Sequence, residues 1–229
     1  AVIVYYSLEV RAEKQYQLGE PEEVDKIRFK DLLELNPAFW YISLLCVTFY
    51  SAIFPFQTFA VKFFQDHHGL TREMAGFTSS IITFASMIGT PIFGYMIDRI
   101  GKRASLMMWG SVLLVPVYLM LVYTAIHPLV PMVIMGISFC LIPAAMWPSV
   151  ALVVREGKLG TAYGLMTMIQ NIGLFGFNLM IGFANDISGG YTAGMWIFSV
   201  LGFAGMLFAW LLKRSDAKHN DSRLEVMTV

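Results

Sequence analysis

Six long apolar stretches constrain this chain more than any other feature of its sequence. They lie at 38–61, 74–97, 104–126, 129–154, 159–185 and 191–212. Each would cross about 30 Å of hydrocarbon as a helix that rises 1.5 Å per residue, and helices satisfy their own backbone polar groups in lipid. No stretch alternates polar and apolar residues as a barrel strand does. The sequence therefore predicts an all-α, polytopic membrane protein.

The composition supports this class and argues against others. Of the 229 residues, 57% are hydrophobic and only 14% are charged, whereas about a quarter of the residues in a soluble domain are charged. The 16 basic residues balance the 16 acidic ones, so charge gives no indication of a nucleic-acid partner. Cys46 and Cys140 lie inside apolar stretches, which favours packed side chains over a disulfide or a metal site. We predict neither a metal nor a cofactor.

The segments outside the spans indicate how the chain is organised. Residues 1–8 are apolar but too short to span a bilayer, and we interpret them as the end of a preceding transmembrane helix. Residues 9–36 are polar and form a predicted linker, followed by a six-helix unit at 37–213 and a tail at 214–229. We expect the chain to be the second half of a larger protein.

The positions of Lys and Arg orient the spans. If the linker is cytoplasmic, so are the loops after the second and fourth spans and the C-terminal tail. These segments hold every Lys and Arg except Lys62 and Arg72. Because cytoplasmic loops are enriched in basic residues, we predict that both ends of the six-helix unit, the linker and the tail are cytoplasmic.

A short basic loop joins the second and third spans. It reads Gly-Tyr-Met-Ile-Asp-Arg-Ile-Gly-Lys-Arg over residues 94–103. Gly94 leaves room for close helix approach, and Gly101 permits a sharp turn. Asp98 ends its helix where the dipole disfavours a carboxylate. We therefore expect Asp98 to pair with a cation or with the N-terminus of another helix.

Polar and aromatic residues in kinked or glycine-rich spans are the candidate substrate contacts. Gln170 and Asn171 lie mid-span among glycines, where amides hydrogen-bond a solute or another helix. Trp147 lies between two prolines that bend the fourth span and offers an aromatic wall or an indole donor. Tyr50 and Gln57 flank a proline in the first span. Helix packing is the alternative role for each.

The middles of the spans carry no Asp, Glu, Lys or Arg. Intramembrane ionisable residues usually mark proton or ion relays, so uniport and ion-coupled transport both stay open. A membrane enzyme would need His, Asp or Glu at catalytic spacing within the spans. Because the spans lack such clusters, we predict that the protein is not an enzyme.

The spans, the linker and the basic loop resemble the C-terminal half of a major facilitator superfamily transporter. The strings at 145–150 (Ala-Met-Trp-Pro-Ser-Val), 159–164 (Leu-Gly-Thr-Ala-Tyr-Gly) and 170–173 (Gln-Asn-Ile-Gly) are similar to a group that contains a lysosomal dipeptide transporter and its bacterial relatives. The resemblance implies a twelve-helix fold with substrate bound between two six-helix halves. It also implies that the first, second, fourth and fifth spans line the cavity, which brings all five candidate residues within reach.

The resemblance implies a role in conformational gating for the basic loop. In that superfamily the Asp of the loop stabilises one conformation by touching a helix of the opposite half. Asp98 would then face an N-terminal half that lies outside this chain. The residues of this gating motif are Gly94, Asp98, Arg99, Gly101, Lys102 and Arg103, with Lys102 at a position where Arg is commoner.

These observations predict a secondary transporter that moves small organic solutes across the bilayer by alternating access, with dipeptides as the substrate class implied by the resemblance. The alternatives are a superfamily transporter for a sugar or an organic anion, and a membrane scaffold that does not transport. The implied location is a bacterial inner membrane, or a lysosomal membrane in a eukaryote. A dipeptide carboxylate needs a cation, and we expect the N-terminal half to supply it because these spans supply none.

Overall fold

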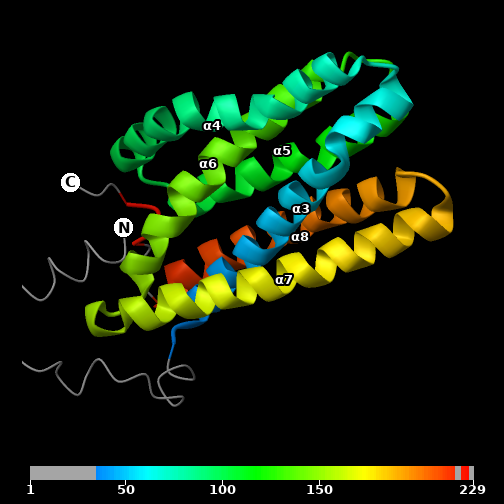
Figure 1. Ribbon diagram of the computed structural model, residues 1–229. Helices are drawn as coiled ribbons and strands as arrows, with labels where there is room; N and C mark the ends of the chain where they lie inside the picture. Colours follow the sequence, from blue (N-terminus) through cyan, green and yellow to red (C-terminus); the bar gives the residue numbers. More distant parts are fainter. Residues whose placement is uncertain (1–34, 220–222, 227–229) are drawn as a thin grey trace, which may run out of the picture. The chain divides into compact units, whose positions relative to one another are not determined.

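Six long α-helices make up nearly all of the described chain. The structure is a computed structural model that describes residues 35–219 and 223–226. The helices are α3 (Pro37–His68), α4 (Arg72–Ile100), α5 (Arg103–Tyr123), α6 (Leu129–Val153), α7 (Leu159–Ser188) and α8 (Thr192–His219), with a 3₁₀ turn, η2 (Glu156–Lys158), before α7 (Figure 1). Each of the six is long and apolar enough to cross a membrane. The predicted all-α, six-span architecture is confirmed. The predicted helix end at 1–8 and most of the 9–36 linker lie outside the described residues.

Short connections join successive helices, which therefore run in opposite directions. The side chain of Asn36 accepts the N–H of Ala38 at 3.0 Å and caps the start of α3. Gly69, with φ of 64°, ends the same helix. Four of the helices run past the ends of their predicted apolar stretches: α3 continues to His68 rather than 61, α4 to Ile100 rather than 97, α7 to Ser188 rather than 185, and α8 to His219 rather than 212. Polar residues at these ends keep the helical backbone without needing lipid around them.

Small residues set the distances between several helices. α3 packs against α7 and α8, α5 packs against α6 and α8, and α4 packs against α6. A Cβ added to Gly110 of α5 would lie 2.5 Å from Ile142 Cγ1 of α6, and one added to Gly136 of α6 would lie 2.7 Å from Ala85 Cβ of α4. Glycine at these positions lets the backbones approach closely, as in other membrane helix pairs.

Aromatic side chains from three helices pack near Pro55 of α3. Pro55 lies inside this helix and has no N–H to donate. Close to it, the buried Tyr118 of α5 donates its hydroxyl to the carbonyl of Ala52 at 2.6 Å. The rings of Phe56, Tyr118 and Phe198 lie within 6.1 Å of one another, centre to centre. This contact joins α3, α5 and α8 into one core.

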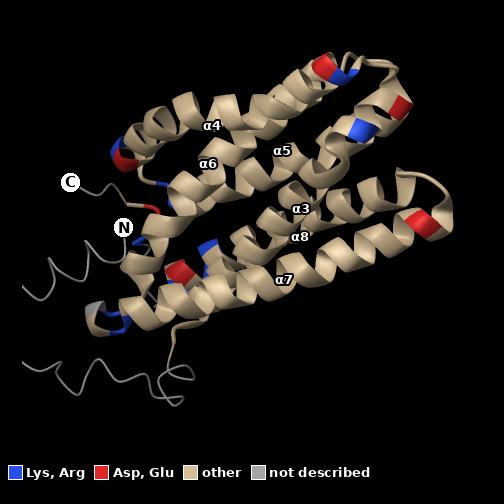
Figure 2. Ribbon diagram, in the orientation of Figure 1, with Lys and Arg blue, Asp and Glu red and all other residues tan. Residues whose placement is uncertain are grey.

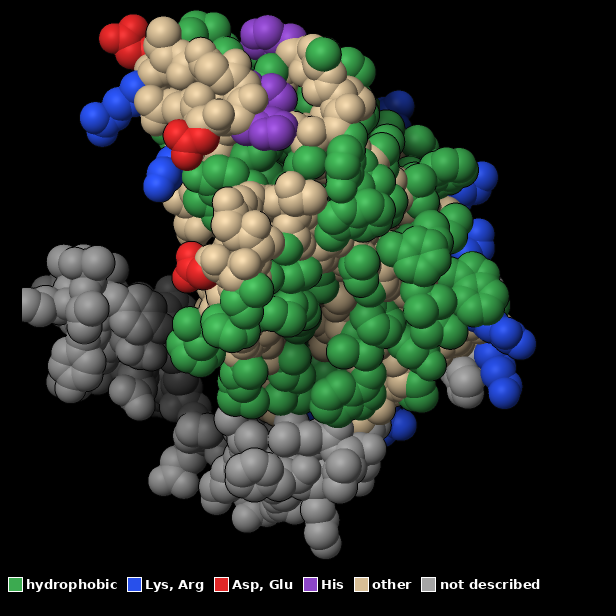
Figure 3. Space-filling model, turned by 90° about the vertical axis from the view of Figure 1, so that its right-hand side faces the viewer, with side chains coloured by type: hydrophobic (Ala, Val, Ile, Leu, Met, Phe, Trp, Pro, Cys, Tyr) green, Lys and Arg blue, Asp and Glu red, His purple; other side chains and the backbone are tan. Residues whose placement is uncertain are grey.

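The helices differ in how much of each is covered. In the most apolar part of α3, 61% of residues are buried, against 11% for α4 and 11% for α7. Large apolar side chains project from these two helices, among them Met87 of α4 and Phe183 of α7. Hydrophobic side chains cover much of the face seen in Figure 3. Among the described helices, charged residues gather at the two ends rather than along the middle (Figure 2).

Candidate functional site

The predicted gating motif covers the end of α4, a two-residue turn and the first residue of α5. Gly101 has φ of 67° and its N–H donates to the carbonyl of Ile97 at 2.8 Å. Lys102 also has positive φ, 49°, which is uncommon for a residue with a side chain. Gly94 lies one turn before Asp98, and a Cβ added there would meet nothing within 4 Å. Gly94 therefore faces open space rather than another described helix.

Asp98 pairs with Arg103 across this turn. Arg103 Nη2 donates to Asp98 Oδ1 at 2.8 Å, with 66% of the Asp98 side chain and 4% of the Arg103 side chain exposed. Arg103 thus supplies the cation, one of the two kinds of partner expected for Asp98. The guanidinium of Arg99 lies 4.6 Å from the centre of the Tyr95 ring. The large exposed fraction of Asp98 leaves room for a further contact outside this helical unit.

Residues near the C-terminus reach the same motif, and the sequence patterns gave no indication of this. The N–H of Arg103 donates to the carbonyl of Leu224 at 2.7 Å. Leu224 is fully buried although it follows α8 in the segment predicted to be a cytoplasmic tail. A lone apolar residue between charged ones carries too weak a pattern to predict such docking.

Two of the five candidate substrate residues meet directly. Trp147 of α6 donates its indole N–H to the hydroxyl of Tyr50 of α3 at 3.0 Å. Tyr163 of α7 donates to the carbonyl of Trp147 at 3.0 Å, and the two rings stack at 6.0 Å. The ring of Phe54 stacks on Tyr50 at 5.4 Å. This aromatic cluster (Tyr50, Phe54, Trp147 and Tyr163) joins α3, α6 and α7. Tyr163 stands in a string whose resemblance to known transporters was noted, but its spacing does not reveal the bond to Trp147.

The three candidate amides lie apart from that bond. The Nδ2 of Asn171 donates to the carbonyl of Thr167 on its own helix at 2.8 Å, and Asn171 is exposed. Asn178, two turns further on, repeats this arrangement with Leu174 at 2.9 Å. Gln170 and Gln57 are half-buried. No hydrogen bond or ring contact within the described ranges ties Gln57, Gln170 or Asn171 to the aromatic cluster.

A pocket lies at the opposite end of the helices from the gating motif. It has a volume of about 360 Å³ and is lined by Phe63, Asp66, His67, Val122, Gly189, Gly190, Tyr191 and Thr192. The hydroxyl of Tyr191 donates to Asp66 Oδ2 at 3.0 Å. Partial burial, and then the bond and the charge of Asp66, raise the pKa of Tyr191. None of the five candidate substrate residues lines this pocket.

The comparisons with known proteins agree with one another on a single family. The chain matches the family model described as Major Facilitator Superfamily over residues 1–177 and 41–226. It is 34% identical over 182 residues to the lysosomal dipeptide transporter MFSD1 of Bos taurus, covering 80% of this chain and 39% of that protein. The identity to the Homo sapiens MFSD1 is 32% over 182 residues. That alignment also covers 80% of this chain and 39% of the human protein. The chain thus spans about two fifths of the length of these curated relatives.

A solved structure shows the same arrangement of helices. The crystal structure of the peptide transporter POT, an E310Q mutant in complex with sulfate, superposes with a TM-score of 0.72. The match covers 89% of this chain and 44% of that chain, at 14% sequence identity. At this identity the likeness concerns the fold alone.

Proposed function

This chain belongs to the Major Facilitator Superfamily, and from that premise we propose that it forms one half of a secondary transporter of small organic solutes. The observation that carries the proposal is the exposed face of α7. Asn171 and Asn178 lie two turns apart on that face and are exposed, although α7 is a membrane-spanning helix. Amides facing hydrocarbon are costly, so this face is suited to a second half or to a water-filled cavity.

The least covered helices supply the surface for a second six-helix half. α4 and α7 are each 11% buried in their most apolar part. α4 adds hydroxyl groups to its exposed side, where Ser80 and Ser86 donate to carbonyls of their own helix at 2.8 and 2.7 Å. A solute bound between the halves would contact these polar groups, and the rigid helices that carry them would move as one body around it, as alternating access requires.

Dipeptides are the proposed substrate class, and support comes from the lysosomal dipeptide transporters among the relatives. In this proposal Trp147 and Tyr50 form an aromatic wall at the cavity, and Gln170 and Asn171 offer amide donors and acceptors to the peptide bond of the solute. Gln57 is a further polar candidate on α3. The cation for the substrate carboxylate would come from the N-terminal half.

The gating motif has a separate role in this proposal. Asp98, held by Arg103 with 66% of its side chain exposed, would make its second contact with a helix of the opposite half in one conformation only. Loss of that contact would shift the populations of the transporter's states without altering the solute contacts.

The test is dipeptide uptake by the full-length protein in proteoliposomes, beside Trp147→Ala and Asn171→Ala. We expect both variants to fold and to lose most uptake. Trp109→Ala is the matched control, because Trp109 is an exposed tryptophan on α5. Its uptake should equal that of the unaltered protein. Absence of dipeptide uptake by folded protein would remove the substrate class, and a wider panel of sugars and organic anions would then test transport itself.

A further inference from the structure

Residues 223–226 return to the basic end of the helices, the end that carries Arg99, Lys102, Arg103 and Lys213. The N–H of Leu224 donates to Asp216 Oδ2 of α8 at 2.9 Å. The carbonyl of Leu224 accepts the N–H of Arg103, the first residue of α5, at 2.7 Å. One residue thus uses both of its backbone groups to bridge two helices, while its side chain is fully buried.

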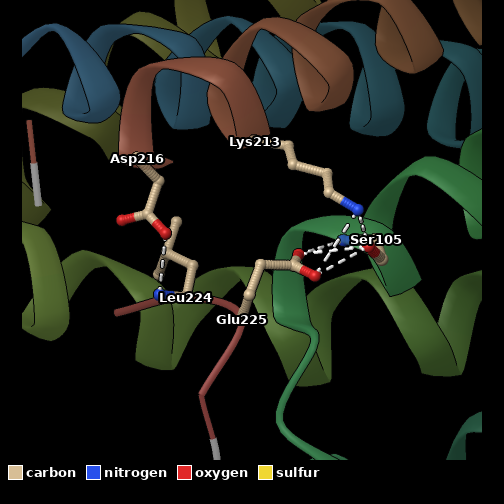
Figure 4. Close-up of polar contacts among 5 residues, drawn as sticks. All are labelled: Ser105, Lys213, Asp216, Leu224 and Glu225. Carbon is tan, nitrogen blue, oxygen red and sulfur yellow. Dashed lines mark hydrogen bonds and ion pairs between the residues drawn. The ribbon is translucent and has the colours of Figure 1, made fainter. Parts of the chain in front are cut away.

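The next residue, Glu225, caps α5 from far along the sequence (Figure 4). Its Oε1 accepts the backbone N–H of Ser105 at 2.9 Å. The Ser105 hydroxyl lies 2.9 Å from Oε2 and 3.1 Å from Oε1. Lys213 of α8 donates to the Ser105 hydroxyl at 2.7 Å and lies 3.6 Å from Oε2.

The start of α5 lacks a cap of its own. The first N–H groups of a helix have no partner inside it, and the side chain of Lys102, at the N-cap, does not cap them. A carboxylate is also favoured near the positive end of the helix dipole. Glu225 supplies the acceptor and the charge, and Lys213 adds an opposite charge beside it.

We propose that the ends of α5 and α8 form a binding site for a short leucine–acidic peptide segment, that residues 223–226 are its occupant, and that occupation holds the gating motif in place. The site offers a buried place for one Leu side chain, a donor and an acceptor for its backbone, and a cationic anchor for the next carboxylate. Its link to the motif is Arg103, which bonds Leu224 through its backbone and Asp98 through its side chain.

This inference assigns a function to the gating motif and so rests in part on the proposed transport, but binding is measurable without any solute. Tethering makes the segment's effective concentration high, on the order of millimolar for short flexible linkers. After removal of the segment, the same segment should therefore refill the site when it is supplied as a free peptide at a comparable, roughly millimolar concentration.

The experiment uses the full-length protein in detergent or nanodiscs with residues 223–229 deleted. A labelled synthetic peptide of residues 223–229 should bind the deleted protein, and peptides carrying Leu224→Asp or Glu225→Gln should bind at least about tenfold more weakly. An Arg223→Gln peptide is the matched control, because Arg223 is exposed and makes no hydrogen bond or ion pair with the helices as far as the structure describes them. It should bind as the natural peptide does.

Hydrogen exchange measures the effect of the segment on the gating motif and the start of α5. Deletion should speed exchange of the Arg103 and Ser105 amides roughly tenfold, because both lose their acceptors, and added peptide should restore their protection. A folded deletion protein that binds no peptide, or whose amide exchange at these positions is unchanged, would overturn the proposal. Failure of dipeptide uptake alone would count against the proposed transport and not against this site.

Discussion

Helices α3 and α7 lie side by side, yet Tyr50 and Ala52 of α3 are used differently from Asn171 and Asn178 of α7. In α3, the most covered helix, Tyr50 accepts a hydrogen bond from another helix, and the carbonyl of Ala52 accepts one from Tyr118. In α7, the exposed Asn171 and Asn178 donate only to carbonyls of their own helix. The bonds at Tyr50 and Ala52 hold α3 to its neighbours, whereas the amides of Asn171 and Asn178 are satisfied within α7 and remain available to an outside partner.

The contrast extends to glycine and should give the largest effect on folding. Gly110 of α5 lies against Ile142, with 2.5 Å between an added Cβ and Cγ1, whereas Gly176 of α7 has nothing within 4 Å. Gly110→Val should lower the free energy of unfolding by about 1–3 kcal/mol through overpacking. Gly176→Val should leave it nearly unchanged. Thermal unfolding of the two variants in the same detergent measures the difference, and equal losses would break the contrast.

Tyr118→Phe should have an intermediate effect. It removes a hydroxyl that donates to Ala52 at 2.6 Å in the buried core, and a lost buried hydrogen bond costs roughly 0.5–1.5 kcal/mol. Tyr41→Phe is the control, since Tyr41 is a half-buried tyrosine of α3 for which the described residues provide no hydrogen bond. If denaturant unfolding gave both variants the same stability, the contact between α5 and the kink of α3 would not matter to the fold.

The smallest effect on stability, and the sharpest test of α7, is expected for Asn178→Leu. Its amide is exposed and bonded only to Leu174, so the free energy of unfolding should change by less than about 0.5 kcal/mol. Uptake by the full-length protein should nevertheless fall, because the amide faces the proposed cavity or the second half. A variant with normal uptake and raised stability would mean that Asn178 faces lipid.

Hydropathy was sufficient to predict the six helices, since each span needs a long apolar run whatever its neighbours are. The pairing of Asp98 with a cation followed from its place at the end of a helix, but the partner, Arg103, depends on a turn of only two residues. The bond between Trp147 and Tyr50 depends on how α3 and α6 pack, and no local pattern encodes that register. The docking of Leu224 and Glu225 was missed for the same reason, because its partners are distant in sequence.

The turn formed by Gly101 and Lys102 leaves almost no slack between α4 and α5. A tilt of α4, one of the two least covered helices, would therefore also move the first turn of α5. In that first turn, Ser105 donates its N–H to Glu225 and accepts a hydrogen bond from Lys213 of α8. The turn, Ser105 and Glu225 thus connect the ends of α4, α5 and α8, so a displacement of any one of these ends would alter the contacts of the other two.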